Sequence, residues 1–155
     1  MNTDLRDTIK EKLYECDKHV EKLETAKSYL KALYPFTIKN YLNADAVESS
    51  FIDQLVFRFS KLQDTLGERI FPSLLILTAE DVKRKTFIDI LNRLEELELI
   101  DKLQWLRLRE TRNEIAHEYS ENTGDVVNSI NDVYDKSRQT IEIYSRIKNY
   151  IQRLL

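Results

Sequence analysis

The stretch "LRDTIKEKLYECDKHVEKLETAKSYLKAL", residues 5–33, decides the fold class of this chain. Its apolar side chains recur at steps of three and four residues, which is typical of an amphipathic α-helix. They are Leu5, Ile9, Leu13, Cys16, Val20, Leu23, Ala26, Leu30 and Leu33. We expect a helix that begins after Asn2 or Thr3 and ends before Tyr34-Pro35, because proline disfavours helical geometry in the preceding residue. At 1.5 Å per residue it is roughly 45 Å long.

The same periodicity predicts a second long helix. It begins at a cap, Asn43 or Asp45, and ends near Ile70, where Phe71-Pro72 is expected to break it. Its aromatic residues indicate a buried position, and Phe57 is expected to widen the buried stripe. After the proline, the run "SLLIL" is expected to form a short helix, since a strand would have no visible partner.

Three more helices complete the expected fold. They span about 87–98, beginning near Thr86, about 101–117 and about 125–155. On the 101–117 helix, Leu103 is expected on the apolar side, and Trp105 is expected to pack in the core or an interface. His19 is expected to be exposed on the first helix.

Composition agrees with this reading. Two glycines and two prolines among 155 residues are too few for a turn-rich β architecture, and 33% of the residues are charged. We therefore predict one all-α domain, residues 1–155, folded as an up-and-down bundle of about five helices. Because the apolar stripes are broad and aromatic residues are numerous, we expect a homodimer.

The composition also indicates the cellular compartment of the protein and the kinds of partner it can bind. The lone Cys16 excludes an intrachain disulfide, and neither a secretory signal nor a membrane-spanning run is visible, so we expect a cytoplasmic protein with no membrane partner. The 24 basic and 27 acidic side chains give a net charge of −3. Any contact with nucleic acid must therefore use a local basic patch, for which the candidates are Lys102, Arg107, Arg109 and Lys83 to Lys85.

One motif carries chemistry. In "RNEIAHEY", residues 112–119, Asn113 and His117 are four residues apart and share a helix face. Arg112 and His117 are about 140° apart on a regular helix, so they meet only if the helix end unwinds or across a symmetric interface. Imidazole can take the proton of a ribose 2′-hydroxyl, and guanidinium can hold the adjacent phosphate. Asn113 could fix the imidazole tautomer. Such a reaction needs no metal or cofactor, and the sequence has no metal-ligand motif.

This motif resembles the arginine, polar residue, spacer, histidine signature of the HEPN superfamily. The longer form resembles that of HepT-type toxins and of nucleotidyltransferase substrate-binding proteins. The resemblance implies an all-α homodimer whose paired motifs form a metal-independent ribonuclease site. It also implies that Arg112 and His117 are catalytic, Asn113 orients, and Tyr119 is AMPylated by a cognate nucleotidyltransferase antitoxin.

Alternatives remain at each position. His117 could be a helix C-cap, Asn113 a solvated residue, and Tyr119 a packing residue. Arg112 could be a surface ion-pair partner of neighbours on the Glu114 side or of another helix. The acidic neighbours Glu110, Glu114 and Glu118 would repel RNA. They favour a second hypothesis, a non-catalytic subunit that binds substrate or nucleotide for a partner nucleotidyltransferase. A third hypothesis is a helical scaffold.

Overall fold

The structure of the protein, a computed structural model, describes residues 3–115 and 121–155. All regular structure in these two ranges is helical, which confirms the predicted all-α class. No helix within them is both long and apolar enough to cross a membrane. The elements are α1 (Thr3–Leu30), α2 (Ile38–Leu42), α3 (Ala46–Thr65), the π-helical turn η1 (Leu66–Ile70), α4 (Phe71–Leu77), α5 (Phe87–Glu96), α6 (Lys102–Glu114) and α7 (Thr123–Leu154).

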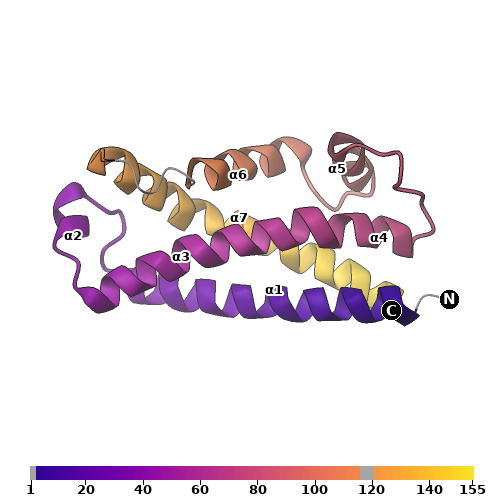
Figure 1. Cartoon of the computed structure of the whole chain (residues 1–155), viewed down its shortest axis with the longest axis horizontal. Coiled ribbons are helices and arrows are strands. Elements are labelled where there is room, and N and C mark those ends of the chain that lie inside the picture. The colour runs from indigo at the N-terminus through magenta and orange to yellow at the C-terminus, as the bar shows by residue number, and fades with distance from the viewer. Residues whose placement is uncertain (1–2, 116–120) are drawn as a thin grey trace.

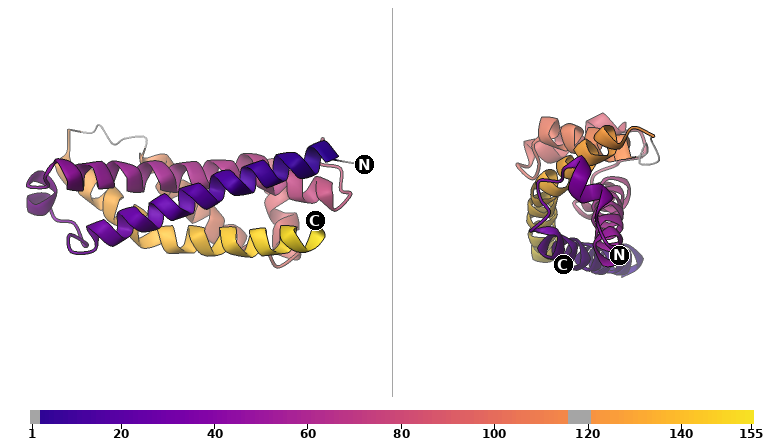
Figure 2. Two further views of the ribbon diagram at one scale, coloured as in Figure 1. Left: turned by 90° about the horizontal axis from the view of Figure 1, so that it is seen from below. Right: turned by 90° about the vertical axis from the view of Figure 1, so that its left-hand side faces the viewer.

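The helices form an elongated bundle. Helices α1, α3 and α7 run along its length, and α5 and α6 cover one side (Figure 1). Helix α1 runs in the opposite direction to α3 and α7, so α1 begins and α7 ends at the same end of the bundle. The end-on view in Figure 2 shows α1, α3, α7 and the α5–α6 layer around a common centre. Helices α1 and α3 make the most extensive pair, and α6 packs against both α3 and α7.

The core is built from the predicted stripes. On α1 the residues Ile9, Leu13, Cys16, Leu23, Ala26 and Leu30 are buried, and on α7 the residues Ile130, Val133, Ile143, Ile147 and Ile151 are buried. Beside them, Lys148 donates to Asp17, 2.8 Å from Nζ to Oδ1, and the Tyr144 hydroxyl donates to the same carboxylate at 2.6 Å. These contacts fasten α7 to α1 beside the apolar stripe.

Helix starts follow the expected cap chemistry. Asp45 accepts from the Glu48 backbone N–H at 2.8 Å, and Thr86 accepts from that of Asp89 at 3.2 Å, so both predicted caps are confirmed. Helix α1 ends at Leu30, three residues before the expected end, and the connector after it contains the short helix α2. A capping box at Thr37 explains α2, and this signal was missed.

The expected break at Phe71-Pro72 is wrong. The chain continues from α3 through η1 into α4, and Pro72 lies in the first turn of α4. The Phe71 N–H bonds to the Leu66 carbonyl, five residues back. In a regular α-helix the ring of Pro72 would clash with the carbonyl four residues earlier, and the wider π-helical turn absorbs this interruption.

Two apolar residues expected on buried faces are exposed. Phe57 on α3 is 46% exposed, and Leu103 on α6 is 59% exposed. Tyr14 and Tyr29 on α1 also lie at the surface, so the aromatic residues do not all belong to the core. Helix α3 buries Ile52, Leu55, Phe59 and Leu62 instead. Because successive residues are about 100° apart around a helix, Phe57 lies on nearly the opposite side from these four.

Candidate functional site

Helix α6 presents the first part of the motif from a well-anchored position. Asp101 caps its start by accepting from the Gln104 backbone N–H at 3.1 Å. Its buried face comprises Trp105, Leu108 and Thr111, spaced at three residues, and the capping residue Ile115 is also buried. Trp105 is fully buried, as expected for a core residue. Because this face is fixed, Arg109 and Arg112 project together towards α3.

Arg112 forms a two-pronged ion pair with Asp64, near the end of α3. Its Nη2 lies 3.0 Å from Asp64 Oδ2, and its Nε lies 3.2 Å from Oδ1. Arg109 donates to the same carboxylate, 2.9 Å from Nη1 to Oδ1. One carboxylate therefore orients two guanidinium groups. The structure agrees here with the alternative in which Arg112 pairs with another helix.

The ionisation of this cluster follows from its contacts. Partial burial alone would raise the pKa of Asp64, but hydrogen bonds from Arg112 and Arg109 and their charges outweigh burial and lower it. The pKa of Arg112 is raised, first by its hydrogen bond to Asp64, although partial burial opposes this. The nearby charge of Glu68 acts in the same direction as Asp64. Both partners are held in their charged forms.

A lysine from α7 also reaches α6. Lys136 Nζ donates to the Thr111 hydroxyl at 3.0 Å, and Thr111 is buried. The sequence offered no signal for either Lys136 or Asp64, because each lies far along the chain from the motif. Their contribution depends on how the helices pack.

A cavity of about 640 Å³ opens beside Arg112. Its walls come from α2, α3, the end of α6 and the start of α7. The apolar part comprises Ile52, Val56, Ile115, Val126 and Ile130, and Tyr41 and Phe57 add two aromatic rings. Lys61 and Arg112 supply positive charge, and Asp53 supplies one carboxylate. Cavities of this volume and mixed lining are typical of small-ligand sites.

The predicted site residues are only partly gathered. Arg112 and Arg109 lie together on α6, and Asn113 is exposed on its last turn. His117 and Tyr119 lie outside the described residues, beyond the end of α6 at Glu114. Whether they approach Arg112 stays a prediction.

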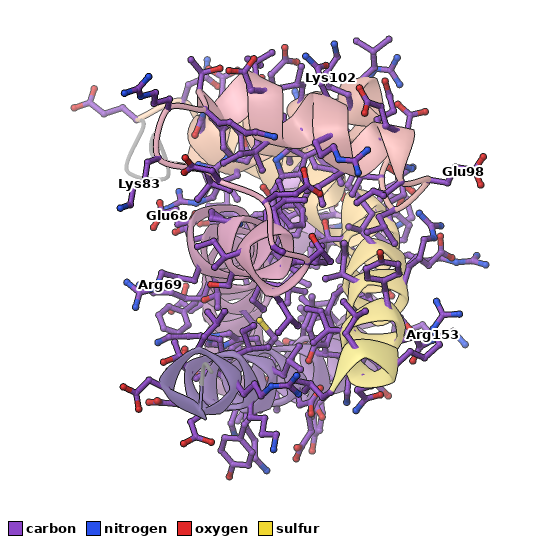
Figure 3. The ribbon with its side chains drawn as sticks, turned by 90° about the vertical axis from the view of Figure 1, so that its right-hand side faces the viewer. Glu68, Arg69, Lys83, Glu98, Lys102 and Arg153 are labelled. Carbon is purple, nitrogen blue, oxygen red and sulfur yellow. The ribbon has the colours of Figure 1, made fainter. Side chains whose placement is uncertain are left out.

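The other candidate cations lie elsewhere. Lys102 begins α6, about 15 Å from Arg112 along the helix axis, and donates to Asn92 at 2.8 Å. In Figure 3, Lys102 lies at the top of the end-on view, and Lys83 and Glu98 project from opposite sides. Arg107 is exposed on α6. Lys102 therefore lies at the other end of α6 from Arg112.

The second histidine is not simply exposed, as the sequence had indicated. His19 is half-buried between α1 and α3, with Arg58 Nη1 3.0 Å from its Nδ1. Burial lowers the pKa of His19, and the charge of Arg58 lowers it further. Within the described ranges, no three His, Cys, Asp or Glu side chains gather as a group that could hold a metal ion.

No protein-family model matches this chain, and no curated protein or solved structure matches it. The resemblance to the HEPN superfamily therefore rests on the motif in the sequence and on the all-α fold of the described residues.

Proposed function

We propose that the protein is a metal-independent endoribonuclease toxin whose partner is a nucleotidyltransferase antitoxin. The observation that carries the proposal is the pairing of Arg112 with Asp64 at the end of α6, next to a cavity. Arg112 begins the "RNEIAHEY" motif, so the arginine that the HEPN resemblance makes catalytic is already oriented and partly buried. Orientation of a cation before substrate arrives is what stabilisation of a developing phosphate charge requires.

In the proposed reaction, His117 takes the proton of a ribose 2′-hydroxyl. The 2′-oxygen then bonds to the adjacent phosphorus, and the bond from phosphorus to the 5′-oxygen breaks. A proton returns to the leaving 5′-oxygen, which leaves a cyclic phosphate and a 5′-hydroxyl. Arg112 neutralises the charge that grows on the phosphate oxygens, and Asn113 holds the imidazole tautomer. A homodimer would bring two motifs together, and AMPylation of Tyr119 would block the site with a charged nucleotide.

The test uses RNA cleavage in EDTA. Wild type, Arg112→Ala and His117→Ala are incubated with tRNA and mRNA, and products are separated on denaturing gels. We expect each substitution to slow cleavage by at least about 100-fold, the usual size of a lost acid–base or charge-stabilising group. Arg138→Ala is the matched control, because Arg138 is exposed and pairs with Glu142 at 3.0 Å on α7. Equal cleavage by all four proteins, or none by wild type, contradicts the proposal.

A second candidate is a non-catalytic subunit that binds nucleotide or substrate for the nucleotidyltransferase. It is favoured by the carboxylates around Arg112: Asp64 pairs with it, and Glu110 and Glu114 are exposed on the same helix. This candidate predicts harmless expression, no RNA cleavage and a tight complex with a nucleotidyltransferase. Growth arrest on expression of the wild type, relieved by His117→Ala, would exclude it.

A further inference from the structure

The exposed ring of Phe57 lies in an unusual setting. The sequence places Phe57 among the apolar residues of α3, yet it is 46% exposed and forms part of the cavity wall. The Arg58 guanidinium carbon lies 5.1 Å from its ring centroid, and Lys61 Nζ lies 5.7 Å from it. An exposed aromatic face flanked by cations combines the two features with which proteins hold single-stranded nucleic acid.

Three cavity residues repeat along one face of α3. Asp53, Phe57 and Lys61 are four residues apart, so an acceptor, a ring and a cation follow one another over about 12 Å. Among the described residues, no carboxylate forms an ion pair with Lys61, and its ammonium group lies beside the Phe57 ring. Lys61 can therefore bind a phosphate with its whole ammonium group, whereas Nε and Nη2 of Arg112 already donate to Asp64.

The remaining lining suits a ribonucleotide. Ser129 places a hydroxyl group on the α7 side of the cavity, and Tyr41 adds a second ring from α2. On the α3 side, the Ser60 hydroxyl donates to the Val56 carbonyl at 2.8 Å, so its oxygen can only accept. The apolar residues Ile52 and Val56 extend the surface beside Phe57. Base faces need apolar and aromatic contacts, base edges and sugars need polar partners, and phosphates need cations. All three kinds of group line one cavity of about 640 Å³.

We propose that this cavity binds one unpaired nucleotide of a single-stranded RNA. The base lies on the ring of Phe57, its amino edge faces Asp53, and its phosphate contacts Lys61. Arg112 lines the same cavity, so the bound nucleotide presents the neighbouring phosphodiester to it. The assignment of this subsite rests on the proposed function, cleavage of RNA. It further specifies that the bound RNA is single-stranded and contributes one unstacked nucleotide, rather than a duplex.

The experiment measures binding separately from cleavage. The probe is a short fluorescein-labelled RNA of randomised sequence with 2′-O-methyl groups on every ribose, which cannot undergo attack by a 2′-oxygen. Binding is followed by fluorescence anisotropy in EDTA over a series of salt concentrations, for wild type, Phe57→Ala and Lys61→Gln. Circular dichroism and sedimentation velocity check folding and assembly.

The chain contains a matched control. Tyr14 on α1 is 64% exposed, and Lys18 Nζ lies 5.6 Å from its ring centroid, outside the cavity. We expect Phe57→Ala to weaken binding about tenfold, as for loss of one stacked base. Lys61→Gln should reduce the slope of log K against log salt by about 0.7, as for loss of one phosphate contact on a single strand. Tyr14→Ala and Lys18→Gln should bind as wild type does.

The alternatives give different results. If both cavity variants bind like their controls, or if wild type does not bind the probe, the subsite is overturned. A change in the sedimentation coefficient of Phe57→Ala without a change in RNA affinity would indicate that a second copy of the chain covers the cavity. If, in addition, Lys61→Gln leaves the dependence of log K on log salt unchanged, the proposal is wrong. If the wild type binds the probe but does not cleave RNA, and the Phe57→Ala and Lys61→Gln variants lose binding, the proposed nuclease activity is rejected and the proposed subsite is retained. If the wild type cleaves RNA and both variants bind the probe as it does, the subsite is rejected and the nuclease activity is retained.

Discussion

Arg112 and Asp64 are 48 residues apart in sequence and form a two-pronged ion pair, with 3.0 Å from Nη2 to Oδ2 and 3.2 Å from Nε to Oδ1. The pair joins the end of α6 to the end of α3. It fixes the plane of a guanidinium group that we propose to be catalytic. Asp64 accepts from Nε and Nη2 of Arg112, and no hydrogen bond within residues 3–115 and 121–155 uses its Nη1, which could donate to a phosphate oxygen.

Asp64→Asn tests this orientation. The amide keeps the size of the carboxylate but removes the charge that aligns Arg112, so we expect kcat for RNA cleavage to fall about tenfold with little change in KM. Asp64→Glu retains the charge and should recover part of the rate. The control is Glu80→Gln, because Glu80 holds Arg93 in a similar pair, 2.9 Å and 3.1 Å from Arg93 Nε to the two carboxylate oxygens, away from the motif. An unchanged kcat in Asp64→Asn would exclude a positioning role for this carboxylate.

The same pair predicts a pH dependence of stability. The pKa of Asp64 in the folded protein lies below its ordinary 3.8 because Arg112 and Arg109 outweigh the effect of burial. A carboxylate of this kind adds stability that is complete above its unfolded pKa and is lost as the pH falls through its folded pKa. We therefore expect wild type to exceed Asp64→Asn in free energy of unfolding at pH 6. The difference should shrink below about pH 4. Urea titrations at several pH values measure it, and a difference independent of pH would contradict the assignment.

His19 predicts a second pH effect, near neutrality. Its folded pKa is lowered by burial and then by the charge of Arg58, so folding favours the neutral ring. The stability that depends on the neutral ring is complete above the ordinary pKa of 6.5 and is lost as the pH falls through the lower folded value. The two proteins compared are His117→Ala, in which His19 is the one histidine, and the double variant His19→Asn/His117→Ala. Between pH 7 and pH 5, the double variant should lose less thermal stability than His117→Ala does. Equal losses in the two proteins would refute the prediction.

Gly67 in η1 predicts a packing effect. A methyl group added there would lie 3.2 Å from Trp105 Cζ2 and 3.7 Å from Phe87 Cζ. Alanine has the better helix propensity, but Trp105 is fully buried and its ring packs 4.7 Å from that of Phe71. We expect overpacking to dominate, so that Gly67→Ala lowers the free energy of unfolding by about 1 kcal/mol.

A double-mutant cycle with Trp105→Phe provides the check on this cause. The smaller ring leaves space for the methyl group, so Gly67→Ala should cost less in that background than in wild type. Chemical denaturation of the four proteins measures the coupling. If the two substitutions are additive, contact with Trp105 does not explain the effect.

Several features of the fold were predictable because they are local. The α1 stripe from Ile9 to Leu30, and the caps at Asp45 and Thr86, depend on neighbours within a few residues. Helical periodicity is read over such distances, so the all-α class followed directly. Helix continuity across Pro72 did not follow, because a π-helical turn leaves no pattern that distinguishes it from a break.

Some residues of the candidate site were also predictable from the sequence, and others were not. The motif identified Arg112, but its partner Asp64 and the basic neighbour Lys136 come from other helices. Phe57 matched the apolar pattern of α3. Its exposure follows from the tertiary structure, in which α2, α3, α6 and α7 leave a cavity beside its ring.

The sequence by itself determined that the chain is all-α, which face of α1 is buried and which motif residues have the chemistry to act on a phosphodiester. Only the tertiary structure decided that one carboxylate holds Arg109 and Arg112, and that Phe57, Lys61 and Arg112 line a single cavity. The reason is physical. Local periodicity reflects the geometry of one helix, whereas these contacts depend on the rotation and register of several helices, which are set by how their side chains pack together.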